Sequence, residues 1–100
     1  MSDRTMNEAR ARVPTTSGAK YVQQLCKHWA HKLPVESDGD AGVVTFEGGL
    51  LTMRAGAEAI DVSLQSEDRE TIERLKPVVA NHLDRFAFRE APLTFDWTWA

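Results

Sequence analysis

The chain has 100 residues, of which 42% are hydrophobic and 27% charged, and its formal net charge is -3. This composition is that of one ordinary globular domain and excludes an intrinsically disordered chain. The slightly acidic balance gives no general attraction to nucleic acid or to a membrane surface, so we expect neither as a partner. Cys26 is the single cysteine, which excludes an internal disulfide and is typical of a reducing compartment. The charged start is not typical of a signal peptide, and we expect a cytoplasmic protein.

The N-terminal segment is expected to be a tail followed by a short strand. Residues 1–9 are mostly polar, so we expect a disordered tail there and a single α+β domain over 10–100. An alternation of apolar and polar residues over 11–15 predicts a strand. Pro14 has no amide hydrogen, so this strand must lie at an edge or leave the proline nitrogen on an unpaired side.

The longest helical pattern of the chain predicts a helix over 19–33. Ser17 is placed to cap its start, and Pro34 disfavours helical geometry at the residue before it. The residues that share its apolar face are Val22, Leu25, Cys26, Trp29 and Leu33. Because Cys26 belongs to this face, we expect a buried and inert thiol.

Residues 35–65 change to a period of two and predict an antiparallel meander. Asp38-Gly39, Gly48-Gly49 and Ala55-Gly56 are turn signals, at which a hairpin can close cheaply. The expected strands are 35–37, 42–47, 50–55 and 58–65. One face of this sheet is apolar and should meet the helices, while the other is polar and should be open to water or to a partner.

A second helix and a final extended segment follow. Ser66 is placed to cap the helix, whose apolar stripe continues to Phe86. Pro77 falls inside it and should kink it near Lys76 without ending it. Residues 93–99 alternate again, and their apolar face should either add to the sheet or form a dimer surface.

These elements predict an α+β two-layer sandwich of β-α-β4-α order with a C-terminal extended strand. Two helices would cover one face of the antiparallel meander. This order is similar to that of the small domain shared by the TATA-box-binding-protein fold and the C-terminal domain of phosphohexomutases. The similarity is one of element order and carries no function.

Two histidines near the end of the first helix form a candidate metal site. His28 and His31 lie about one helical turn apart, so their imidazoles are placed to share an ion. The alternative is that they are simply cations placed favourably at a helix C-terminus, next to Lys27 and Lys32.

A second candidate site follows from residues late in the other helix. His82, Arg85, Arg89 and Glu90 could together hold a small anion such as a carboxylate or phosphate. The alternative is a core histidine with satisfied ring nitrogens beside a solvated helix end. Counting reversals of the chain makes the two helices antiparallel and places His28 about 15 Å from His82. We therefore expect no joint site within one subunit.

Two blocks, YVQQLCKHWAHKLPVE and NHLDRFAFREAPLTFDW, resemble a family of small bacterial proteins, domain-of-unknown-function 2218, from about residue 10 onward. The family's pattern falls on Tyr21, Leu25, Cys26, His28, Trp29, His82, Leu83, Phe86, Arg89, Glu90 and Trp97. The resemblance implies no established activity. Some members occur beside siderophore-interacting flavin reductases, which implies a link to iron handling and such a reductase as partner. Without a flavin or nicotinamide fingerprint, this chain would be its accessory.

We therefore expect a binding or accessory domain for an iron-related ligand or a small anion, with a metal ion as the one candidate cofactor. It should self-associate as a homodimer, through the polar sheet face or the strand that carries Trp97 and Trp99. One alternative is a small enzyme in which His82 is the acid or base and Arg89 clamps an anionic substrate. Another is a purely structural homodimer.

Overall fold

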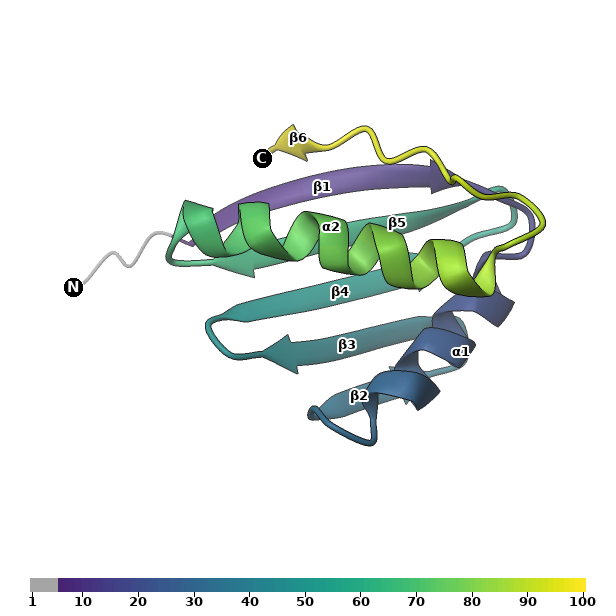
Figure 1. Cartoon of the computed structure of the whole chain (residues 1–100), viewed down its shortest axis with the longest axis horizontal. Coiled ribbons are helices and arrows are strands. Elements are labelled where there is room, and N and C mark those ends of the chain that lie inside the picture. Colours follow the sequence, from purple (N-terminus) through teal and green to yellow (C-terminus); the bar gives the residue numbers. More distant parts are fainter. Residues whose placement is uncertain (1–5) are drawn as a thin grey trace.

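The structure is a computed structural model that describes residues 6–100. Two helices cover one face of a six-stranded antiparallel sheet (Figure 1). The elements are β1 (Asn7–Pro14), α1 (Gly18–Trp29), β2 (Val35–Asp38), β3 (Ala41–Phe46), β4 (Gly49–Ala55), β5 (Ala59–Ser66), α2 (Arg69–Phe86) and β6 (Thr98–Trp99). The predicted α+β two-layer sandwich is confirmed.

The strand order in the sheet is β2-β3-β4-β5-β1-β6. The meander over 35–65 is confirmed, and Gly39 and Gly48 adopt positive φ angles of 62° and 83° in its first two hairpins. β1 pairs with β5 along its whole length, while β6 pairs only with Ala9 and Arg10. Pro14, the last residue of β1, lies beyond the stretch that β6 pairs with, so its nitrogen, which has no hydrogen to donate, leaves no bond of the ladder unmade.

The core lies between the sheet and the helices. Alternate side chains point to opposite faces of a strand, and the helix-facing set is buried as predicted. From β3, β4 and β5 this set comprises Val44, Leu51, Met53, Ile60, Val62 and Leu64. β1 adds three smaller residues on the same face, Ala9, Ala11 and Val13.

Both helices begin or end differently from the prediction. α1 ends at Trp29, four residues before Leu33, and 30–32 form a turn in which the Leu33 N–H still donates to the Trp29 carbonyl at 2.8 Å. The chain must turn here because the Pro34 carbonyl already accepts the Thr45 N–H of β3, at 3.0 Å. Ser17 occupies the N-cap position, but its side chain makes no capping bond.

The N-cap of α2 is Asp68, not Ser66. The Asp68 carboxylate accepts the Glu70 N–H at 3.0 Å. Ser66 is buried and donates instead to the Gly48 carbonyl at 2.6 Å, so it fastens the end of β5 to the β3–β4 turn. The helix continues through Pro77, as predicted.

The two ends of the chain are more ordered than expected. The predicted tail over 1–9 is too long, because 7–9 belong to β1, and Ala9 is fully buried. Residues 1–5 lie outside the described residues. At the other end, 98–99 add to the edge of the sheet, which settles one of the two roles predicted for this segment. Over 6–100, neither helix combines the length and the apolar character needed to cross a membrane.

Candidate functional site

The seam between α1 and α2 brings two of the three histidines together. The rings of His28, in the last turn of α1, and His82, on α2, have centroids 5.6 Å apart. The predicted separation of about 15 Å is wrong, which removes the reason for expecting no joint site.

The predicted antiparallel direction of the two helices is correct. The error lies in the position of α2 along α1. Tyr21 at the start of α1 contacts Glu90 just beyond α2, whereas His28 at the end of α1 contacts His82, so the helices are antiparallel. The distance of about 15 Å assumes that α2 starts beside the end of α1. Instead, α2 also contacts β1 and β5, α1 contacts β2, β3 and β4, and the helices meet toward the C-terminal end of α2 (Figure 1).

Aromatic rings surround the histidine pair. The Trp29 ring lies 4.9 Å from the His82 ring and 5.1 Å from Phe46, centroid to centroid. Phe86, one turn after His82, lies 6.0 Å from His28. Trp29 is buried and both histidines are half-buried, so the pair sits at the edge of the core, where the dielectric constant is lower than in water.

The hydrogen bonds and charges around the two histidines favour ring nitrogens that keep a lone pair for a ligand. The His82 Nδ1 atom is 2.7 Å from the Val78 carbonyl oxygen, which can only accept, so Nδ1 carries a proton and Nε2 holds the lone pair of the neutral ring. Burial lowers the pKa of His28 below its usual value of 6.5, as do the neighbouring His82 and Arg85. A neutral His28 ring offers one nitrogen to a ligand, and the bond to Val78 leaves the Nε2 atom of His82 available.

The predicted pairing of His28 with His31 stays a prediction. His31 is exposed in the turn after α1, although its charge contributes to lowering the pKa of His28. Within residues 6–100 no three His, Cys, Asp or Glu side chains cluster in a way that could hold a metal ion. An ion at the His28–His82 pair would thus take its other ligands from solvent or from a bound small molecule.

The second predicted site is divided by the structure. Arg89 and Glu90 line a cavity of about 390 Å³ at the start of α1, together with Lys20, Tyr21 and Phe88. His82 instead faces His28, and Arg85 is exposed and near enough to His28 to affect its pKa. The four residues predicted to hold one anion therefore do not form one pocket.

Glu90 has a role that the sequence analysis missed. Its carboxylate accepts hydrogen bonds from the Thr15 hydroxyl at 3.0 Å and from the Tyr21 hydroxyl, so it joins the end of α2 to the start of α1. The bond to Glu90 raises the pKa of Tyr21, and burial raises it further. The available signal was Tyr21 itself, because a tyrosine on a buried helix face needs a partner for its hydroxyl.

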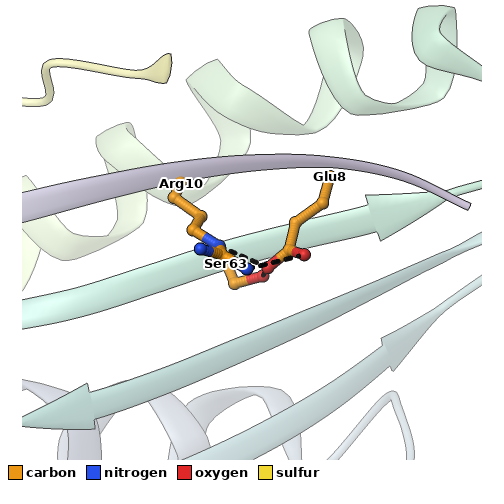
Figure 2. A network of polar contacts seen from close by, with 3 residues as sticks. All are labelled: Glu8, Arg10 and Ser63. Atoms are coloured by element: carbon orange, nitrogen blue, oxygen red, sulfur yellow. Dashed lines mark hydrogen bonds and ion pairs between the residues drawn. The ribbon is translucent and has the colours of Figure 1, made fainter. Parts of the chain in front are cut away.

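A polar network on the other face of the sheet was also missed. Figure 2 shows Arg10 and Ser63 converging on Glu8, with Arg10 Nε at 2.8 Å and the Ser63 hydroxyl at 2.7 Å from the same carboxylate oxygen. The Arg10 bond, followed by the Ser63 bond, lowers the pKa of Glu8 to about 2. The i, i+2 spacing of Glu8 and Arg10 was the signal, although the polar composition of residues 1–9 predicts a tail there.

Comparisons with known proteins agree with this fold. The NMR structure of PA4090 from Pseudomonas aeruginosa is similar, with a TM-score of 0.78 and 33% sequence identity over 91% of this chain and 94% of that chain. No curated protein matches the sequence. Residues 10–98 match the family described as an uncharacterized protein conserved in bacteria, DUF2218. A match that covers most of the chain shows that this protein belongs to that family.

Proposed function

We propose that this chain is a small binding or accessory domain whose ligand site is the His28–His82 pair. The observation that carries the proposal is the 5.6 Å separation of the two rings, one of which has its Nδ1 proton held by a backbone carbonyl. Fixing one ring nitrogen orients the other, which is how proteins present histidine to a metal. Imidazole suits iron, zinc, copper and nickel, so the ligand is a transition-metal species.

The charges near the pair favour a metal that arrives as an anionic chelate. Arg85, Lys32 and His31 all lower the pKa of His28 through their charges, so they would also repel a bare cation. A small chelator with several carboxylate or phenolate groups would reverse that charge and supply the ligands that two imidazoles leave open. The iron-handling role implied by the family resemblance, as accessory to a reductase, is compatible with such a species.

Fluorescence of Trp29 tests the proposal, because its ring lies 4.9 Å from His82. We expect Ni²⁺ nitrilotriacetate, added to the full chain, to quench this tryptophan with a saturable dependence on concentration. His82→Ala and His28→Ala should each abolish the saturable quench, with folding verified by circular dichroism. His31→Ala is the matched control and should keep it. Equal quenching in all four proteins, or none in the natural chain, would refute the site.

The enzyme alternative has less support. It needs His82 and Arg89 on one substrate, but Arg89 lines the cavity at the start of α1, whereas His82 packs against His28. The Arg89 guanidinium also lies 5.7 Å from the ring centroid of Phe88. Self-association as a homodimer stays a prediction, which light scattering over a range of protein concentrations can measure.

A further inference from the structure

The face of the sheet that the helices leave open contains a hollow of about 620 Å³. Its walls come from β1, β4, β5 and the segment that leads into β6. Hollows of roughly 300–1,000 Å³ are the size that small-molecule ligands occupy in proteins. It lies across the sheet from the His28–His82 pair, so its ligand is independent of the function proposed above.

The register of the strands explains the hollow. Thr52 of β4 pairs with Ser63 of β5, and these two short side chains form its floor. Longer side chains surround them: Arg54 and Arg12 flank Asp61 in the neighbouring row, and Arg10 lies beside Ser63. Across β1, Arg10 pairs with Thr98, which closes the far side together with Asp96.

The three arginines differ in how many of their guanidinium N–H groups already have an acceptor. Arg10 is paired with Glu8 at 2.8 Å. Arg12 has only a distant contact, 4.0 Å, with the exposed carboxylate of Asp61. The Arg54 guanidinium has no hydrogen bond or ion pair with any residue from 6 to 100, and neither has the Thr52 hydroxyl. Arg12 and Arg54 therefore keep most of their five N–H donors each for a ligand.

The side chains that line the hollow favour a ligand with hydrogen-bond acceptors at one end and hydrogen-bond donors at the other. Two guanidinium groups favour a phosphate or carboxylate, since arginine binds both in a bidentate manner. Asp61 and Asp96 accept hydrogen bonds and repel further negative charge. A continuous polyanion such as nucleic acid is therefore disfavoured, while hydroxyl groups next to the anion would be bound.

We propose that this hollow binds a small hydroxylated anion, of the class of phosphorylated or carboxylated sugars. Arg12 and Arg54, which lie on either side of Asp61, donate to the anionic group. Its hydroxyl groups donate to the Asp61 and Asp96 carboxylates, and the Thr52 hydroxyl on the floor completes the contact.

Titration of the ¹⁵N-labelled full chain followed by NMR tests this with three probes: glucose 6-phosphate, glucose and inorganic phosphate. We expect glucose 6-phosphate to shift the amide signals of Thr52, Ser63 and Thr98 saturably. Glucose and inorganic phosphate, which each carry half of the required chemistry, should bind at least about tenfold more weakly. Shifts confined to the helices, or no saturable shift with glucose 6-phosphate, would overturn the proposal.

Charge-removing variants give a second readout. Arg54→Gln and Arg12→Gln should each weaken glucose 6-phosphate binding by about tenfold or more, because a charge-assisted pair is lost at an exposed position that leaves the fold intact. Arg74→Gln is the matched control, since Arg74 is exposed on α2 across the sheet, and it should bind as the natural chain does. Equal affinity in Arg54→Gln and Arg74→Gln, or inorganic phosphate binding as tightly as glucose 6-phosphate, would show an unspecific anion effect and refute the site.

Discussion

At the scale of single residues, Glu90 and Glu8 show how carboxylates organise this small domain. Each accepts hydrogen bonds from two other side chains: Glu90 from Thr15 and Tyr21, and Glu8 from Arg10 and Ser63. Both carboxylates join segments that are distant in sequence. Neither cluster includes a histidine, so their effect is on stability and not on the proposed metal site.

Replacing Tyr21 by Phe should lower the free energy of unfolding by about 1.5–3 kcal/mol, since it removes one hydrogen bond to an ionised group. Chemical denaturation measures this change. Thr15→Val removes the other donor to Glu90 together with the acceptor of the Ser17 N–H, so it should cost at least as much as the loss of one hydrogen bond. If Tyr21→Phe is as stable as the natural chain, Glu90 does not fasten the two helices.

Replacing Glu8 by Gln should remove a pH-dependent part of the stability. The pKa of Glu8 is about 2 in the folded chain against a usual 4.5, so its contribution is complete above about pH 4.5 and is lost as the pH falls toward 2. The difference in unfolding free energy between Glu8→Gln and the natural chain should be about 1 kcal/mol at pH 6 and shrink toward pH 2. A difference that stays constant over that range would contradict the bond to Arg10 and Ser63.

At the scale of elements, α1 packs closely on β3. A methyl group added to the buried Gly42 of β3 would overlap the Sγ atom of Cys26 on α1. This contact requires glycine at 42 and explains why the thiol is buried, as predicted. Burial also raises the pKa of Cys26, which disfavours a reactive thiolate.

We expect Gly42→Ala to destabilise the chain by about 1–3 kcal/mol through this overlap. In a Cys26→Ala background the same substitution should cost less, because the overlapping atom is gone, and a double-mutant cycle measures the difference. Gly56→Ala is the control, since a methyl group there meets only the Ala59 carbonyl oxygen at 3.6 Å. Equal costs in both backgrounds would place the strain elsewhere.

At the scale of the whole molecule, the C-terminal segment closes the sheet. The ring of Trp99 lies under the guanidinium of Arg69 at 4.0 Å and the ammonium of Lys76 at 4.6 Å, so α2 holds the short β6 against β1. Trp99 stays 38% exposed, which leaves these cation–π contacts open to solvent.

Trp99→Ala should release β6 while leaving the rest of the sheet in place. We expect a loss of about 1–2 kcal/mol from two solvent-exposed cation–π contacts. Hydrogen exchange should locate the effect: the Ala100 N–H, which donates to the Glu8 carbonyl at 2.8 Å, should exchange faster, while amides of β4 keep their protection. Unchanged exchange at Ala100 would show that β6 does not depend on α2.

A feature could be predicted from the sequence when its signal lies in neighbouring residues. The period-two pattern and the turn glycines of 35–65 are local signals, so the meander and its two faces could be predicted before any fold was known. The burial of Cys26 followed in the same way from the helical pattern over 19–33. The predicted N-cap, Ser66, was wrong by two residues. Ser66 and Asp68 are equally good caps by residue type, and only the long-range bond from Ser66 to Gly48 distinguishes them.

Periodicity alone predicts an α+β sandwich with two covering helices, because it reports which face of each element is buried. The position of β1 between β5 and β6, the contact of His28 with His82 and the hollow bordered by three arginines could be known from the folded chain alone. These depend on where one element sits along another. That position is set by the sum of many side-chain contacts between distant segments, and no local pattern records it.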